Sequence, residues 1–249
     1  MQQGAPPLTV IGIVQARMGS TRLPGKVMLD LAGDPMLVRC MRRIQRCKTI
    51  TKVVVATTIH SADDRIVQLS NEYGWDCYRG SEDDVLDRYY KAAMAHSADV
   101  VVRITSDCPM IDTAIVDRVV KEFMERRQEL DYACNFLPKR TFPRGLDTEV
   151  MHCETLERVW RADNDPASRE HVTPYIYRNP SRFRIHGIMG ESDQSSFRWT
   201  VDTAEDLVFV RLIYEHFGHD HFSSQEVLDV LADHTEWSDL NCSVRQKSI

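Results

Sequence analysis

The sequence lacks any apolar run near the roughly 20 residues that a membrane-spanning helix needs. Its first residues, 1–7, carry no basic segment, and polar residues interrupt the following apolar stretch within about 7 residues, so we expect no signal peptide. The composition, with 43% apolar and 27% charged residues, is ordinary for a globular protein. We therefore predict a cytoplasmic protein that does not bind a membrane.

The seven cysteines include no C-x-x-C pair. An odd number without such a pair fits neither a closed disulfide framework nor a zinc site. We predict that these cysteines are small apolar core residues in a reducing compartment.

Basic charge is scarce, because 31 Lys and Arg face 37 Asp and Glu, for a net charge of −6. A broad basic field is what non-specific nucleic-acid binding requires, so we expect no nucleic-acid partner. No acidic residue precedes Asp30, however, which leaves the N-terminal region locally positive. A small anion is the expected partner.

Alternating strands and helices indicate βαβ units around a mostly parallel sheet. Apolar, β-branched runs predict strands over 9–14, 52–57, 76–79 and 100–104. Apolar positions three and four residues apart predict helices over 36–47, 62–73, 85–96 and 115–126. In such sheets, ligands bind at the carboxyl ends of the strands.

The second half of the chain breaks this rhythm. Short strands are predicted over 131–135, 148–152, 182–187 and 198–201, and helices over 154–162, 169–177, 204–216 and 224–234. We expect one domain spanning 1–249, with a small antiparallel insertion, about 131–197, that projects from the main sheet.

The stretch 15–26, QARMGSTRLPGK, follows the first predicted strand and contains only basic charges. It is not a P-loop, because Gly19 and Gly25 enclose five residues and Val27 stands where a hydroxyl residue should be. A Rossmann G-x-G-x-x-G is also absent.

This stretch can still bind phosphates through backbone N–H groups and basic side chains. The N–H groups are those of Gly19, Ser20 and Thr21, and the side chains are those of Arg17, Arg22 and Lys26. The alternative is a solvated basic turn before a helix.

Two further predicted strands end in carboxylates, at Asp107 and Asp202. A carboxylate beside phosphates is repelled unless a cation intervenes, so Asp107 indicates bound Mg²⁺. Asp107 could instead cap a helix, but Asp112 is the better candidate for that role. Asp202 could cap the next helix or meet Asp107 across a shared metal, while Thr203 and Asp206 form a variant capping box. Together with the basic loop, two such carboxylates favour chemistry on a nucleoside triphosphate.

These motifs carry a family resemblance. The stretch 16–26 resembles the signature loop of the cytidylyltransferases that activate acidic sugars, such as 3-deoxy-manno-octulosonate and N-acylneuraminate cytidylyltransferases. A narrower resemblance, to the spore coat polysaccharide biosynthesis protein F group, rests on RGSEDDVLDRY (79–89), RITSDCP (103–109), FPRGLDTEV (142–150), EHVTPY (170–175) and VDT (201–203). The matching motifs run in the same order over about residues 8–210.

The resemblance implies a three-layer α/β/α nucleotidyltransferase fold of the GT-A type and transfer of CMP from CTP with Mg²⁺. An acceptor oxygen would attack the α-phosphorus and release pyrophosphate, for surface polysaccharide biosynthesis. The implied catalytic residues are Arg17, Lys26 and Asp107. The implied nucleotide contacts are Ala16, Gly19, Ser20, Arg22, Gly80, Ser81 and Arg103, and the implied metal ligands are Asp107 and Asp202.

The acceptor stays open, as a sugar acid, a sugar phosphate or a similar acidic compound. The sugar-acid enzymes usually read Pro-Ala-Arg and Asp-Glu-Pro where this chain has Gln15-Ala16-Arg17 and Asp107-Cys108-Pro109. The expected acceptor contacts are Arg144, Asp147, Glu149 and His171. The insertion around them is also expected to form a homodimer interface.

Two other functions remain as alternatives. A GT-A glycosyltransferase using a nucleotide-sugar would normally show a D-x-D metal motif, which the segment 107–109 does not supply. A non-catalytic nucleotide-binding protein would not need Arg17, Lys26, Asp107 and Asp202 together.

Overall fold

The computed structural model describes residues 7–246, so the first six residues, for which no signal peptide is predicted, lie outside it. The strands are β1 (Val10–Gln15), β2 (Asp30–Leu31), β3 (Asp34–Pro35), β4 (Lys52–Thr58), β5 (Asp76–Gly80), β6 (Val100–Thr105), β7 (Tyr132–Cys134), β8 (Glu149–His152) and β9 (Ile185–Gly187). The α-helices are α1 (Met36–Ile44), α2 (Asp64–Glu72), α3 (Val85–Ala95), α4 (Thr113–Glu125), α5 (Cys153–Ala162), α6 (Pro166–His171), α7 (Pro174–Arg178), α8 (Ala204–Phe217), α9 (Ser224–Asp233) and α10 (Thr235–Asp239). Two short 3₁₀ helices are η1 (Lys26–Met28) and η2 (Ser61–Asp63).

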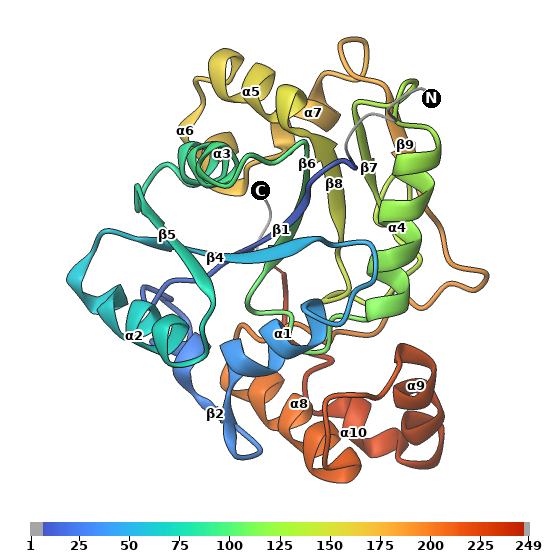
Figure 1. The fold of residues 1–249 in the computed structure, drawn as a ribbon. Coiled ribbons are helices and arrows are strands. Elements are labelled where there is room, and N and C mark those ends of the chain that lie inside the picture. Colours follow the sequence, from blue (N-terminus) through green and yellow to red (C-terminus); the bar gives the residue numbers. More distant parts are fainter. Residues whose placement is uncertain (1–6, 247–249) are drawn as a thin grey trace, which may run out of the picture.

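A seven-stranded mixed sheet runs through the centre of the molecule (Figure 1), in the order β5-β4-β1-β6-β8-β7-β9. The first four strands in that order are mutually parallel, and β8 pairs antiparallel with β6. The carboxyl ends of β1 and β6 therefore lie side by side. The predicted mixed, mostly parallel α/β fold is confirmed, and a separate two-stranded antiparallel sheet joins β2 and β3.

Alternating side chains of the strands supply two cores, one on each face of the sheet. On β1, Val10 and Val14 pack into a core with residues of α1, α4 and α8. Ile11 and Ile13 point to the other face and pack with residues of α3, α5 and α7. The two cores make the fold three layers deep.

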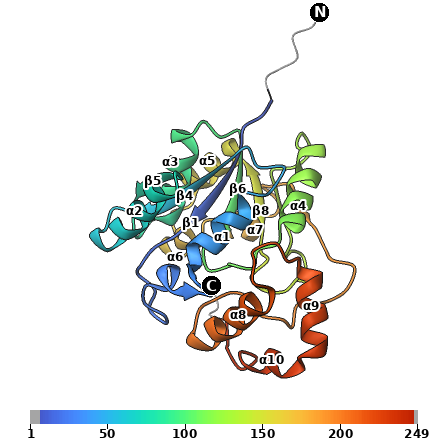
Figure 2. The same ribbon diagram turned by 60° about the horizontal axis from the view of Figure 1, so that its bottom comes forward.

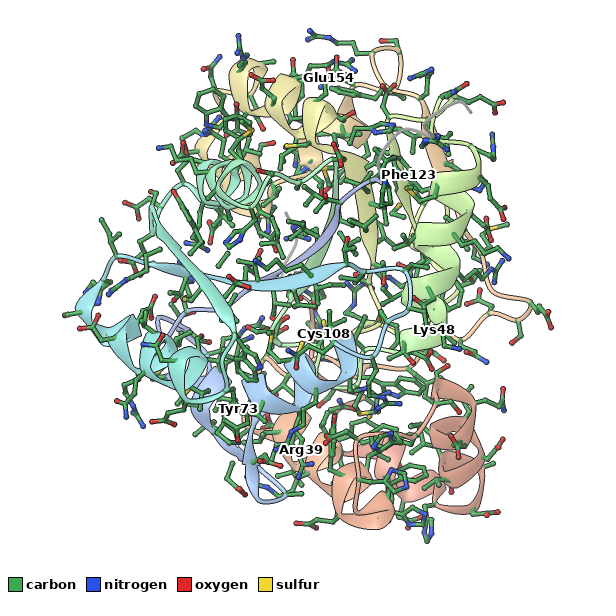
Figure 3. All side chains as sticks on the ribbon, in the orientation of Figure 1. Arg39, Lys48, Tyr73, Cys108, Phe123 and Glu154 are labelled. Carbon is green, nitrogen blue, oxygen red and sulfur yellow. The ribbon has the colours of Figure 1, made fainter. Side chains whose placement is uncertain are left out.

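The C-terminal helices α8, α9 and α10 lie together at one end of the molecule, next to α1 (Figure 2). Arg39 of α1, labelled in Figure 3, donates to the Asp220 carboxylate at 3.1 Å. Arg43 donates to the carbonyl oxygens of Asp220 and Phe222 at 2.8 and 2.7 Å. These buried guanidinium groups fix the loop between α8 and α9 against α1.

The segment 131–197 departs from the prediction, because it does not form a projecting sheet. Its strands β7, β8 and β9 continue the main sheet. The predicted strand 198–201 is wrong, since only an isolated bridge joins Arg144 to Arg198. The predicted helix 169–177 is two helices, α6 and α7, separated at Val172, whose φ is +72°.

Gly145 brings the 142–147 loop against the chain at Trp199. Its φ is +110°, and an added Cβ would lie 2.6 Å from both Thr200 N and the Trp199 carbonyl carbon. We expect Gly145→Ala to lower the free energy of unfolding by about 3 kcal/mol, from backbone strain and overlap. Gly74→Ala is the matched control, because Gly74 also has positive φ (+66°) but nothing lies within 4 Å of the added Cβ. Urea unfolding of both variants measures the difference, and equal losses would contradict this reading.

Two expectations from composition can be compared with the described residues. Across residues 7–246, none of the helices combines the length and apolar character needed to cross a bilayer. All seven cysteines are free thiols. Cys40, Cys47, Cys108 and Cys134 are buried as predicted, whereas Cys242 is exposed.

Candidate functional site

A cavity of about 510 Å³ opens at the carboxyl ends of β1 and β6. Its walls come from the 15–27 loop, the 103–108 segment, α3, the 144–147 loop, the end of α6, and the chain around 200–202. Cys108, labelled in Figure 3, marks the β6 end of this wall, beside α1. The cavity therefore lies where an α/β sheet of this kind binds its ligand.

The 15–26 loop is held in a defined shape. Asp63, 2% exposed, accepts hydrogen bonds from Met18 N at 2.7 Å and from the Thr57 and Thr58 hydroxyls at 3.1 and 2.6 Å. Gly25 has φ +67°, which lets the chain turn directly into η1. The loop is thus an ordered element rather than a solvated turn, and Asp63 is a support that sequence reasoning missed.

Lys26 Nζ lies between the two predicted metal-binding carboxylates. It is 2.9 Å from Asp107 Oδ2, 3.0 Å from Asp202 Oδ1 and 2.8 Å from the Val201 carbonyl oxygen. The three side chains are 12%, 27% and 11% exposed in the order Lys26, Asp107, Asp202. The fold therefore brings together residues 26, 107 and 202, which are far apart in sequence.

Charge pairing sets the protonation of this cluster. Burial lowers the pKa of Lys26, but the Asp107 and Asp202 carboxylates outweigh it and hold the pKa above its ordinary value. Burial raises the pKa of Asp107, but the Lys26 ammonium and hydrogen bonds outweigh it, so the net pKa is lowered. Both groups are charged at neutral pH.

Neither carboxylate serves as a helix cap. Asp112 caps α4, accepting from Ala114 N at 2.8 Å, and this prediction is confirmed. Thr203 and Asp206 form the predicted capping box of α8. Asp202 instead accepts ion pairs at its second oxygen, Oδ2, from Arg22 at 3.0 Å and from Arg198 at 2.8 Å.

The other predicted nucleotide contacts divide into two groups. Lining the cavity are Ala16, Arg17, Gly19, Ser20, Arg22 and Arg103. Arg17 is 3.4 Å from Glu170, and Ser20 N–H donates within the loop to the Met18 carbonyl at 2.8 Å. Gly80 and Ser81 do not line the cavity.

Arg88 of α3 is a lining residue that sequence reasoning missed. It is 1% exposed, and its Nε has no hydrogen-bond partner among residues 7–246. One terminal nitrogen donates to the Ser81 carbonyl at 2.6 Å. Burial lowers its pKa. The sequence did give one sign of this role, because Arg88 is a charged residue on the apolar face of the predicted helix 85–96.

Of the four residues predicted to contact the acceptor, three line the cavity and one does not. Arg144, Asp147 and His171 line the cavity. Asp147 is paired with Arg140, whose second terminal nitrogen donates to Oδ2 at 2.8 Å. Burial lowers the pKa of His171, which favours a neutral imidazole.

Glu149 does not reach the cavity. It is 3% exposed, and its carboxylate is bound by Arg103 and by the Tyr132 hydroxyl at 2.6 Å. The β6–β8 register places Arg103 opposite Glu149. Its position is therefore that of a buried support for Arg103, not of an acceptor contact.

Two known proteins are similar to this chain over most of its length. An uncharacterised protein of Methanocaldococcus jannaschii is 35% identical over 97% of this chain and 98% of that protein. The spore coat polysaccharide biosynthesis protein SpsF of Bacillus subtilis is 30% identical over 89% of this chain and 93% of that protein.

Two solved structures are similar in fold. A cytidylyltransferase from Leptospira borgpetersenii is 32% identical, with a TM-score of 0.90 over 98% of this chain and 100% of that chain. A CMP:2-keto-3-deoxy-manno-octonic acid synthetase complexed with CTP is 18% identical, with a TM-score of 0.67 over 84% and 99% of the two chains. At that identity, the second comparison supports the fold alone.

The family model described as "Cytidylyltransferase" matches residues 11–235. That range contains the basic loop, Asp107, Asp202 and every residue of the seven-stranded sheet except Val10. The prediction of a CTP-dependent nucleotidyltransferase is thereby confirmed, and the chain belongs to the cytidylyltransferase family.

Proposed function

We propose that this chain transfers CMP from CTP to a sugar acid, sugar phosphate or similar anionic acceptor, with Mg²⁺ and with release of pyrophosphate. The product would serve surface polysaccharide biosynthesis. The observation that carries the proposal is the position of Lys26 Nζ, within 3.0 Å of both Asp107 and Asp202 and beside the basic loop. A cation between two carboxylates, next to basic side chains, suits a metal–triphosphate complex.

The residues around Lys26 Nζ fit Mg²⁺. Two carboxylates and the Val201 carbonyl provide only oxygen atoms, and Mg²⁺ is commonly bound by one or two carboxylates plus substrate phosphates. Within the described residues, no group of three or more His, Cys, Asp and Glu could hold a metal. The site would therefore need the nucleotide's oxygens as further ligands. When bound, Mg²⁺ would neutralise charge on the triphosphate and on the departing pyrophosphate.

Lys26 and the arginines of the loop would hold the triphosphate. Lys26 is paired with the two carboxylates, and Arg22 with Asp202. In the complex with CTP, Lys26 and Arg22 would exchange these ion pairs for charge-assisted hydrogen bonds to the phosphates, which are strong. Arg17, which is 37% exposed, needs to give up only one 3.4 Å contact with Glu170.

The acceptor would lie against the part of the cavity wall that Arg144, Asp147 and His171 form. The Arg144 guanidinium has no hydrogen-bond partner among residues 7–246, and burial lowers its pKa. It is therefore available to a carboxylate or phosphate in a bidentate pair. The neutral His171 can accept a hydrogen bond from an acceptor hydroxyl. The homodimer, and acceptor binding by the segment 131–197, remain predictions.

In the proposed reaction, an acceptor oxygen forms a bond to the α-phosphorus as the bond to the β-phosphate oxygen breaks. The electron pair of that bond leaves with pyrophosphate, and the acceptor's proton passes to solvent. The protein contributes positioning and electrostatic stabilisation, because phosphoryl chemistry of this kind needs little covalent help.

Pyrophosphate release tests the proposal. CTP, ATP, GTP and UTP are each combined with a sugar acid, a sugar phosphate, a polyol phosphate and a phosphonate, with and without Mg²⁺. We expect release with CTP at least about tenfold faster than with the other nucleotides, only with both acceptor and Mg²⁺ present. Absence of release with every pair, together with no thermal stabilisation by any nucleotide, would overturn the proposal.

A further inference from the structure

Arg198 stands directly behind Asp202, on the side away from Lys26. Its NH2 group donates to Asp202 Oδ2 at 2.8 Å, whereas Lys26 contacts Oδ1. Arg198 is 9% exposed, so this contact is shielded from water. The arginine therefore holds one carboxylate oxygen and leaves the other facing Asp107.

The fully buried Asp206 carboxylate fixes the orientation of the Arg198 guanidinium. Asp206, 0% exposed, accepts from Arg198 Nε at 2.8 Å and from NH2 at 3.0 Å. The same carboxylate accepts from the backbone N–H groups of Asp202 and Thr203, at 2.9 and 3.1 Å. Asp206 thus orients both the side chain that contacts Asp202 and the backbone that carries it.

The C-terminal segment 241–246 supplies two further hydrogen-bond partners to Arg198 and Asp206. Asn241, 3% exposed, donates from Nδ2 to the Arg198 carbonyl and to Asp206 Oδ1, both at 2.9 Å. Gln246 Oε1 accepts from Arg198 NH1 at 2.8 Å. Gln246 also lines the cavity that contains Lys26 and Asp107. A segment outside the matched range 11–235 therefore reaches the site.

We propose that Arg198 is a positioning residue for Asp202, and that Asp206 and the segment 241–246 lock its guanidinium in place. The inference rests on the proposed function, in which Asp202 is a metal ligand. An arginine is required, because one planar group must serve Asp202, Asp206 and Gln246 at once, which a lysine ammonium cannot do. Groups that orient a metal ligand commonly change metal affinity about tenfold to a hundredfold when they are replaced.

Mn²⁺ binding in the presence of CTP, without acceptor, tests this role. We expect Arg198→Lys to raise the Mn²⁺ dissociation constant at least about tenfold, while CTP affinity measured without metal changes less than about twofold. With acceptor present, high Mg²⁺ should restore much of the turnover of Arg198→Lys.

Gln246→Ala should weaken Mn²⁺ binding about threefold, since it removes one hydrogen bond at the edge of the network. Arg161→Lys is the control, because Arg161 is exposed and, among residues 7–246, its side chain pairs only with Glu157.

Three outcomes decide the matter. This inference would be overturned if Arg198→Lys and Gln246→Ala bind Mn²⁺ as tightly as wild type while Asp202→Asn binds it much more weakly. The proposed function would then still stand. Unchanged Mn²⁺ affinity in Asp202→Asn would overturn the metal assignment itself. If Arg198→Lys fails to fold, Gln246→Ala carries the test, because Gln246 is exposed and its loss leaves the Arg198–Asp206 pair intact.

Discussion

Asp107→Asn is expected to lower turnover with CTP and Mg²⁺ about a hundredfold to a thousandfold. The asparagine side chain keeps the shape but loses the charge, and a bound metal typically contributes several kcal/mol to stabilising such a reaction. The fold should be retained, because the Asp107 backbone carbonyl, not its side chain, accepts the hydrogen bonds from Val201 N and the Thr200 hydroxyl. Steady-state pyrophosphate release measures the effect.

The control for Asp107→Asn is Asp229→Asn. Asp229 is an exposed residue of α9 whose side chain, among residues 7–246, accepts a hydrogen bond only from Gln225. The turnover of Asp229→Asn should equal that of the wild-type chain. Asp107→Asn turnover within about threefold of wild type, at saturating Mg²⁺, would remove Asp107 from the catalytic centre.

Lys26→Met is expected to lower kcat/KM about a hundredfold to a thousandfold, because the triphosphate loses a charge-assisted contact in a partly buried site. The variant should also bind divalent cations more tightly in the absence of nucleotide. Lys26 competes for the same carboxylate oxygens, at 2.9 and 3.0 Å. Its removal therefore leaves Asp107 Oδ2 and Asp202 Oδ1 without the cation that they share.

Lys48→Met is the control for the loss of a lysine charge. Lys48 is exposed and lies away from the cavity lining (Figure 3). Kinetic assays with CTP should show wild-type behaviour for Lys48→Met. A Lys26→Met variant with normal kcat/KM would show that Lys26 is only a structural counter-ion for Asp107 and Asp202.

Much of the parallel half of the fold could be predicted from the sequence, since its strands are apolar runs that end in polar residues. Because parallel strands have their carboxyl ends at one edge of the sheet, the sequence also predicted that Asp107 and the basic loop lie at that edge. Asp202 meets them although its predicted strand is absent, because Val201 N bonds directly to the Asp107 carbonyl at 2.8 Å.

The position of Glu149 was harder to predict, because it depends on pairing between distant strands. Glu149 falls opposite Arg103 only through the antiparallel β6–β8 register, 46 residues apart in sequence. Periodicity predicts that α3 has a buried face, but not that Arg88 on that face borders the cavity. The role of Arg198 likewise depends on a C-terminal segment that shows no motif.

The most direct test of the central claim is the affinity of the chain for Mn²⁺ without nucleotide, measured by the electron paramagnetic resonance of the free ion. The claim is that Asp107 and Asp202 hold the cation and that Lys26 holds the phosphates. We predict that Lys26→Met binds Mn²⁺ at least about tenfold more tightly than wild type, and that adding Asp107→Asn abolishes the gain. Equal affinity in wild type and Lys26→Met, or a gain that survives Asp107→Asn, would contradict the account.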